Sequence, residues 1–329
     1  MSAKNLAHAF AFTLCLAAVL PLGPGACAGR PDGDVAPSAD GDLAEAQGVP
    51  PGREGFKYPG AAARAPADVE PGVDSSGREP MAEINAKVIE ELYIAQGNAL
   101  WAVDSQTAAH YALNPDQPYM NVMASTGGYI YGVLSDHFYR INPDPNSGPG
   151  GYVSLGSGWQ GSEAMAALSN FVYTVQGGEL WKTNGLTGDT VHFGASWAGT
   201  EALTAGLVSF VSVSVPYVFG VQGGSLWAVN ANNGAVVSLG SGWEGTEAMT
   251  FGNGYLFIAQ GDALWRYRVA SGVTTMIEGY GWSGTEAMTF RDGFIYAVQG
   301  GQLWVTSPNG GSVSLGGGWE GTLSMAARR

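Results

Sequence analysis

The sequence repeats itself at intervals of about 40 residues, and this repetition restricts the possible folds more than any other feature. The clearest unit is Gly-x-Gly-Trp-x-Gly-Thr/Ser-Glu-Ala-Met, at residues 156–165, 240–249 and 279–288, with degraded copies around Trp197 and Trp319. A second motif, Gln-Gly-x-x-Leu-Trp, follows most of these copies, and the two motifs together hold all 10 tryptophans. A fixed period of this length indicates either a solenoid or a β-propeller.

Each period is long enough for four strands and has the turn residues to separate them. In the unit that covers residues 247–277, apolar runs alternate with turns at Asn253-Gly254, Gly261-Asp262 and Ser271-Gly272. Asn-Gly and Gly-Asp pairs between β-branched or aromatic runs are strong hairpin signals. Four antiparallel strands per repeat predict the blade of a propeller rather than the strand-and-helix unit of a horseshoe.

The number of repeats sets the number of blades. We predict an all-β fold, a six-bladed β-propeller of four-stranded antiparallel blades, from the Leu-Trp-type positions at residues 101, 139, 181, 227, 265 and 304. The chain ends in a lone inner strand at 323–326, which we expect to complete a first blade that begins near Glu91, although residues 83–88 compete for that place. Such closure removes an exposed sheet edge. An alternating apolar insert at 207–216 predicts a hairpin that extends beyond the body.

The N-terminus is typical of an export signal. Lys4 precedes a short apolar stretch, and Ala26-Cys27-Ala28 supplies the small residues that a signal peptidase reads. We therefore predict a signal peptide over 1–28 and a secreted or periplasmic protein; a lipid anchor on Cys27 is the disfavoured alternative, because no leucine precedes it. Residues 29–82, rich in Pro, Gly and Ala, predict a disordered linker, and residues 83–329 the propeller. No later segment resembles a transmembrane span.

The charge of the chain narrows the class of partner. The net charge of −14 predicts repulsion of nucleic acid and of anionic membranes. Glycans, proteins and metal ions remain as possible partners. Both cysteines precede residue 29, so the propeller contains no disulfide.

Both repeated motifs are expected on one face of the propeller. If the inner strand of each blade runs away from that face, the Gly-Trp loop and the Gln-Gly turn both return to it. We therefore predict shallow glycan sites there, in which loop indoles stack on sugar rings and the glutamines hydrogen-bond to hydroxyls. The predicted ligand-binding residues are Trp159, Trp197, Trp243, Trp282, Trp319, Gln176, Gln222, Gln260 and Gln299. Packing between blades is the alternative role of the loop tryptophans, and it is the role expected of the Leu-Trp tryptophans.

A carboxylate recurs in the inner strand, at Glu163, Glu201, Glu247 and Glu286. Four carboxylates at one depth of the channel could hold Ca²⁺. They could equally accept backbone N–H groups of the neighbouring blade, which is the role we favour, so no cofactor is expected.

Catalytic constellations are scarce. The three histidines after residue 28 fall at different places in their repeats, and the GxSxG, CxxC and HExxH motifs are absent. The GxGxxG pattern at 240–245 precedes a predicted strand rather than a helix, so we do not interpret it as a dinucleotide site. We expect a protein that is not an enzyme.

The units at 239–243 and 220–227 resemble the repeats of tachylectin- and tectonin-type lectins. The resemblance covers roughly residues 89–329 and implies sugar sites between blades on one face. We therefore expect an exported, lectin-like carbohydrate-binding protein. The alternatives are a protein-interaction platform without a small ligand and a calcium-dependent hydrolase that works in the channel.

Overall fold

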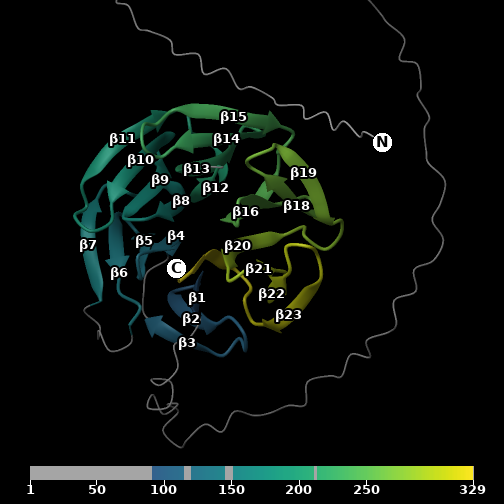
Figure 1. The fold of residues 1–329 in the computed structure, drawn as a ribbon. Helices are drawn as coiled ribbons and strands as arrows, with labels where there is room; N and C mark the ends of the chain where they lie inside the picture. Colours follow the sequence, from purple (N-terminus) through teal and green to yellow (C-terminus); the bar gives the residue numbers. More distant parts are fainter. Residues whose placement is uncertain (1–90, 115–119, 145–150, 211–212, 329) are drawn as a thin grey trace, which may run out of the picture. The chain divides into compact units, whose positions relative to one another are not determined.

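The computed structural model describes residues 91–114, 120–144, 151–210 and 213–328. These residues form six four-stranded antiparallel sheets, arranged as blades around a ring (Figure 1), which confirms the predicted six-bladed, all-β fold. Within these ranges no helix occurs that could cross a membrane. The predicted signal peptide, the linker and the competing segment 83–88 lie outside the described residues.

In all six blades the strands follow the same order from the channel outwards. The blades are numbered 1 to 6 along the chain, and each list below runs from blade 1 to blade 6. The inner strands are β24 (Thr322–Ala327), β4 (Met120–Thr126), β8 (Ser162–Leu168), β12 (Thr200–Ser209), β16 (Thr246–Gly252) and β20 (Thr285–Arg291). The second strands are β1 (Glu91–Gln96), β5 (Tyr129–Leu134), β9 (Phe171–Gln176), β13 (Ser214–Gln222), β17 (Tyr255–Gln260) and β21 (Phe294–Gln299). The third strands are β2 (Ala99–Asp104), β6 (His137–Ile141), β10 (Glu179–Asn184), β14 (Ser225–Asn230), β18 (Ala263–Arg268) and β22 (Gln302–Thr306). The outer strands are β3 (His110–Asn114), β7 (Tyr152–Ser157), β11 (Thr190–Ala195), β15 (Val236–Ser241), β19 (Val273–Glu278) and β23 (Ser312–Gly317).

The C-terminal strand closes the ring as predicted. Strand β24 pairs antiparallel with β1, in a register that joins Leu92 to Ala327 and Gln96 to Thr322. Each inner strand also contacts the inner strands of both neighbouring blades. Blade 1 is therefore assembled from both ends of the described chain, and β24 covers the edge of β1 that would otherwise be free.

The hairpins follow the turn chemistry of the sequence. Asn253 and Gly254 join β16 to β17 with φ angles of 52° and 82°, the pair of positive values that a type I′ turn needs. The hairpin of β12 and β13 is the longest in the ring, with strands of 10 and 9 residues, which confirms the predicted extension. Leu207 on it is half exposed.

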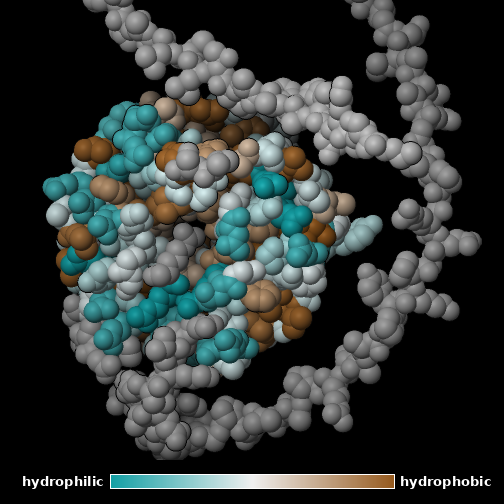
Figure 2. Space-filling model, in the orientation of Figure 1, coloured by the Kyte–Doolittle hydropathy of each residue, from teal (hydrophilic) through white to brown (hydrophobic). Residues whose placement is uncertain are grey.

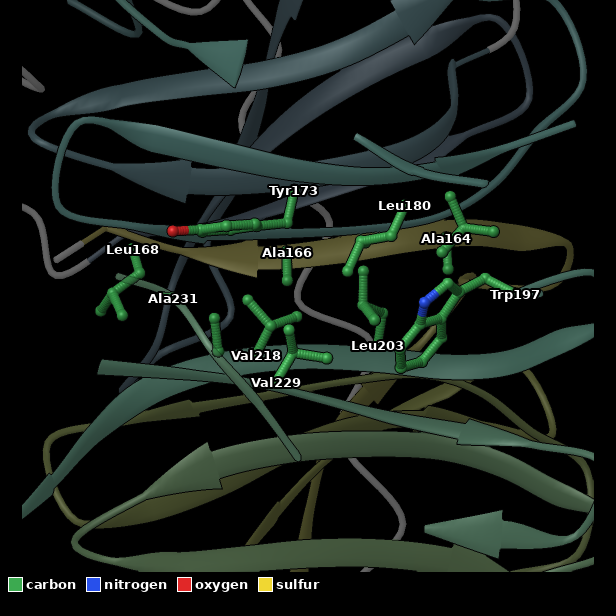
Figure 3. Close-up of a cluster of buried hydrophobic side chains, with 12 residues drawn as sticks. Ala164, Ala166, Leu168, Tyr173, Leu180, Trp197, Leu203, Val218, Val229 and Ala231 are labelled. Atoms are coloured by element: carbon green, nitrogen blue, oxygen red, sulfur yellow. The ribbon is translucent and has the colours of Figure 1, made fainter. Parts of the chain in front are cut away.

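The hydrophobic core is divided into six clusters, one in each gap between neighbouring blades. Figure 3 shows the cluster between blades 3 and 4, in which Tyr173 and Leu180 face Val218 and Val229. Burial raises the pKa of the Tyr173 hydroxyl to about 12. Because each cluster takes side chains from two blades, a blade buries its apolar surface only when both neighbours are present.

Candidate functional site

The two repeated motifs meet on one face of the ring, as the strand directions predict. The backbone N–H of Trp197 donates to the backbone carbonyl of Gly178, 2.7 Å away, in the Gln-Gly turn of the preceding blade. Trp243 and Trp319 repeat this bond at 3.0 and 2.9 Å. Each loop is therefore tied to the turn beside it, and the face is built from interlocked pairs of these segments.

The tryptophans of the Gly-Trp loops point into the gaps between blades. The exposed fractions of Trp159, Trp197, Trp243, Trp282 and Trp319 are 8%, 4%, 7%, 4% and 4%. All five belong to the inter-blade clusters. The expectation that these rings form an exposed stacking surface is therefore corrected, because they pack as wedges and only their edges reach the surface.

The loop backbone explains why the indoles turn inwards. In the loop between blades 4 and 5, Gly242 and Gly245 adopt φ angles of 92° and 71°, which L-residues rarely adopt. The Thr246 hydroxyl then donates to the carbonyl of Trp243 at 2.8 Å. The same hydroxyl bond recurs at Ser162, Thr200, Thr285 and Thr322.

The repeated glutamines hold these loops in place. The Gln260 side-chain amide donates to the carbonyls of Gly242 and Glu244, at 2.9 and 3.0 Å. Gln176, Gln222 and Gln299 donate to the corresponding loops of their own interfaces. The amide N–H groups that we expected to serve ligand hydroxyls thus bind the protein itself, which corrects that role.

The Leu-Trp tryptophans pack against the inter-blade clusters as the sequence predicted, at Trp101, Trp181, Trp227 and Trp265. Trp101, Trp181, Trp227, Trp265 and Trp304 are only partly buried, so they are more exposed than the loop tryptophans. The indole Nε1–H groups of Trp101, Trp227 and Trp304 are nevertheless enclosed without a hydrogen-bond partner. A buried, unpaired donor costs about 1–3 kcal/mol, and this one recurs at three equivalent positions of the repeat.

One of these indoles lines a pocket between blades 3 and 4. The pocket has a volume of about 240 Å³ and is lined by Ala195, Ser196, Trp197, Gln222, Trp227 and Val236. Two predicted site residues, Trp197 and Gln222, are thus brought together there. Trp227, Ser196 and Val236 were missed, because the Leu-Trp motif was assigned to packing.

The residues that pair with the Leu-Trp tryptophans across the sheet help to explain why a pocket lies between blades 3 and 4. Trp227 pairs across the sheet with Ser238, whose side chain is small. In blade 3 the equivalent partner of Trp181 is His192, and the two rings contact at a centroid distance of 5.4 Å. In blade 5 the partner of Trp265 is Met276. Large partners therefore fill the equivalent space in blades 3 and 5.

Ser196 is the unusual residue of the pocket. Its φ of 69° lies in the left-handed region, at a position where the other loops have glycine. This conformation costs a non-glycine residue about 1–2 kcal/mol. Local strain of this kind is often found at binding sites, and Ser196 is one of the residues that line the pocket.

The inner-strand glutamates brace neighbouring blades. A β-bulge at each of them interrupts the register, as between Thr246 and Ala248, and turns the carboxylate out of the ladder. Glu201 then accepts the backbone N–H of Thr246 at 2.9 Å, and Glu163 and Glu247 accept those of Gly199 and Thr285. The favoured bracing role is confirmed for these three.

Glu286 joins the other three glutamates around one mouth of the channel, a hollow of about 160 Å³. Among the described residues, no three acidic, histidine or cysteine side chains lie close enough together to hold a metal ion. Calcium binding and hydrolase activity therefore gain no support from the geometry, and both stay predictions.

The sequence matches no protein-family model and no curated protein sequence. Solved structures with a similar fold include a chain of a nidogen/laminin complex, with a TM-score of 0.58 and 10% identity over 73% of this chain and 98% of that chain. TolB from Acinetobacter baumannii gives a TM-score of 0.53 and 11% identity, over 72% and 66%. At these identities the likeness shows the propeller fold alone, and the resemblance to lectin repeats stays a prediction.

Proposed function

We propose that this chain is an exported glycan-binding protein that takes a sugar residue into the pocket between blades 3 and 4. The observation that carries the proposal is the partly buried indole of Trp227, which lines this pocket together with Trp197 and Gln222. An indole packs well on the apolar side of a pyranose, so this ring suits a sugar residue.

The size of the pocket favours a small ligand. A volume of about 240 Å³ corresponds to about eight water molecules in the liquid, at about 30 Å³ each. It lies just below the range of about 300–1,000 Å³ that is typical of drug-sized ligands. Such a pocket suits one monosaccharide at the end or along the edge of a larger glycan.

Blade 6 repeats part of this arrangement, and we propose it as a second, weaker site. Trp304 also has an enclosed, unpaired indole N–H, and a serine, Ser314, again lies opposite it in the sheet. Blade 1 differs, because His110 packs against both Trp101 and Trp319 at centroid distances of 5.5 and 5.2 Å. Two weak sites on one rigid face would engage a branched glycan together, and avidity would strengthen binding by about 10²-fold.

The experiment is a glycan array on the purified chain, followed by calorimetric titration of the best monosaccharide. The variant Trp227→Phe keeps an aromatic ring but shortens the indole that lines the pocket, and we expect it to weaken binding about tenfold with little change in melting temperature. Trp265→Phe is the matched control at the equivalent position of blade 5. Ser196→Gly should relieve backbone strain and weaken binding. Equal affinity of Trp227→Phe and the unmodified protein, or no binding to any glycan, would refute the proposal.

A further inference from the structure

The channel has two chemically different mouths. A collar of equivalent apolar side chains lies between them, formed by Met123, Met165, Leu203, Met249, Met288 and Met325. On the side of the Gly-Trp loops the mouth is lined by glutamates and by no described lysine or arginine. The opposite mouth is a hollow of about 770 Å³ with contributions from all six blades, and we name it the arginine mouth after Arg268, Arg291 and Arg328 in its lining.

The other described cations of the propeller have structural partners. Arg140, Lys182 and Arg266 each follow the Leu-Trp-type position and reach a turn of the next blade. They donate to the carbonyls of Leu186, Ala231 and Pro308, at 3.2, 2.7 and 3.0 Å. Burial lowers the pKa of Lys182, whose ammonium also lies 4.2 Å from the centre of the Phe171 ring. These three cations brace the blades. The other three described cations, Arg268, Arg291 and Arg328, all line the arginine mouth.

The three arginines of the mouth are held to different degrees. Arg291 is fixed by Asp292, at 2.7 Å, and by the carbonyls of Glu91 and Arg328. Arg328 lies 3.4 Å from the buried Glu91, with its side chain 46% exposed. Arg268 is exposed at the end of β18. Asp292 is the one acidic residue in the described lining, so positive charge predominates there in a chain with a net charge of −14.

Apolar surface surrounds these charges. Phe251 and Phe290 line the hollow but are only 6% and 8% exposed, because their rings stack on Phe219 and Phe257. The long β12–β13 hairpin adds the half-exposed Leu207 to the same lining. Figure 2 shows a face of the ring on which hydrophilic side chains gather beside the central hollow, with hydrophobic patches farther out.

We propose that the arginine mouth is a docking site for an acidic, extended segment of a partner protein. Arginine forks match carboxylates, and the half-exposed Leu207 offers an apolar contact to such a segment. A volume of about 770 Å³ exceeds what a lone ion needs. A sulfated glycan would use the arginines but not this apolar contact, so the combination favours a peptide.

The test is fluorescence anisotropy of a labelled peptide of alternating Glu and Leu residues, titrated with the full chain at low and moderate salt. We expect binding that weakens as salt rises, and a loss of about tenfold, or about 1.4 kcal/mol, in Arg268→Gln. Arg140→Gln removes the same charge outside the mouth and serves as the control. Thermal melts verify that both variants are folded.

Three outcomes would overturn the proposal. The first is equal binding by Arg268→Gln and Arg140→Gln, which would reduce the effect to net charge. The second is equal affinity for a peptide of Gln and Leu, and the third is binding of heparin without binding of the Glu-Leu peptide. Since the sugar pocket lies at the loop face, an excess of the monosaccharide should leave peptide binding unchanged.

Discussion

Replacing Trp243 by alanine should unfold the propeller far more readily than the loop position of this residue suggests. The indole is 7% exposed, belongs to the cluster between blades 4 and 5, and contacts the Tyr267 ring edge-on at a centroid distance of 6.4 Å. Truncation of a buried tryptophan leaves a large cavity and costs about 3–5 kcal/mol. For a domain of this size the corresponding fall in melting temperature is roughly 10 °C.

Urea unfolding followed by far-UV circular dichroism measures this cost directly. Trp265→Ala is the matched variant, because Trp265 is an indole at the same interface that is only partly buried. We expect the loss in Trp243→Ala to exceed the loss in Trp265→Ala by more than 1 kcal/mol. If Trp243→Ala keeps its unfolding midpoint, the loop tryptophans are not structural wedges and the inter-blade account fails.

Three further outcomes follow from the same structure. Deletion of residues 322–329 should expose the β1 edge and make the protein associate, which light scattering would detect; an unchanged monomer would contradict closure by β24. Glu201→Ala should cost about 0.5–1.5 kcal/mol, because the Thr246 N–H loses its shorter bond and keeps only the 3.3 Å bond to the Trp243 carbonyl, whereas a chelator should leave the melting temperature unchanged. The raised pKa of Tyr173 contributes stability that is present below pH 10.0 and is lost as the pH rises to about 12. In Tyr173→Phe the free energy of unfolding should therefore decline less steeply with pH between these values. Equal slopes in the variant and the unmodified protein would contradict this reasoning.

The fold could be predicted from the sequence because the repeat specifies it several times over. Turn pairs such as Asn253-Gly254 separate the strands locally, and the count of Leu-Trp positions sets the number of blades. Closure could be predicted because a final inner strand has one free edge to pair with. Each of these inferences depends on chain connectivity and turn geometry, which a sequence shows directly.

The direction of the loop indoles could not be predicted in the same way. A tryptophan among glycines can lie on a surface or insert into a gap, and the choice depends on φ angles such as the 92° of Gly242. The glutamines show the same limit, because an amide in a turn can serve a ligand or a neighbouring loop. Ser196, in contrast, was visible in the sequence as a serine where other repeats have glycine.

The arginine mouth also escaped the sequence because its members are far apart along the chain. Arg268 ends a third strand, whereas Arg291 and Arg328 lie at the ends of inner strands. The three positions nevertheless share one feature. Each lies at, or directly after, the end of a strand that runs away from the Gly-Trp loops. Comparison of charges by strand position, rather than by repeat motif, would have grouped them.

The most direct test of the proposed sugar site is NMR of the indole N–H groups. The chain has 10 tryptophans, and their side-chain signals can be assigned one by one with Trp→Phe variants. On addition of the monosaccharide selected by the array, we predict a large shift of the Trp227 signal and a smaller shift of the Trp304 signal. The signals of Trp159, Trp243 and Trp282 should stay in place. A titration that moves those loop signals instead, or moves none, would contradict the account.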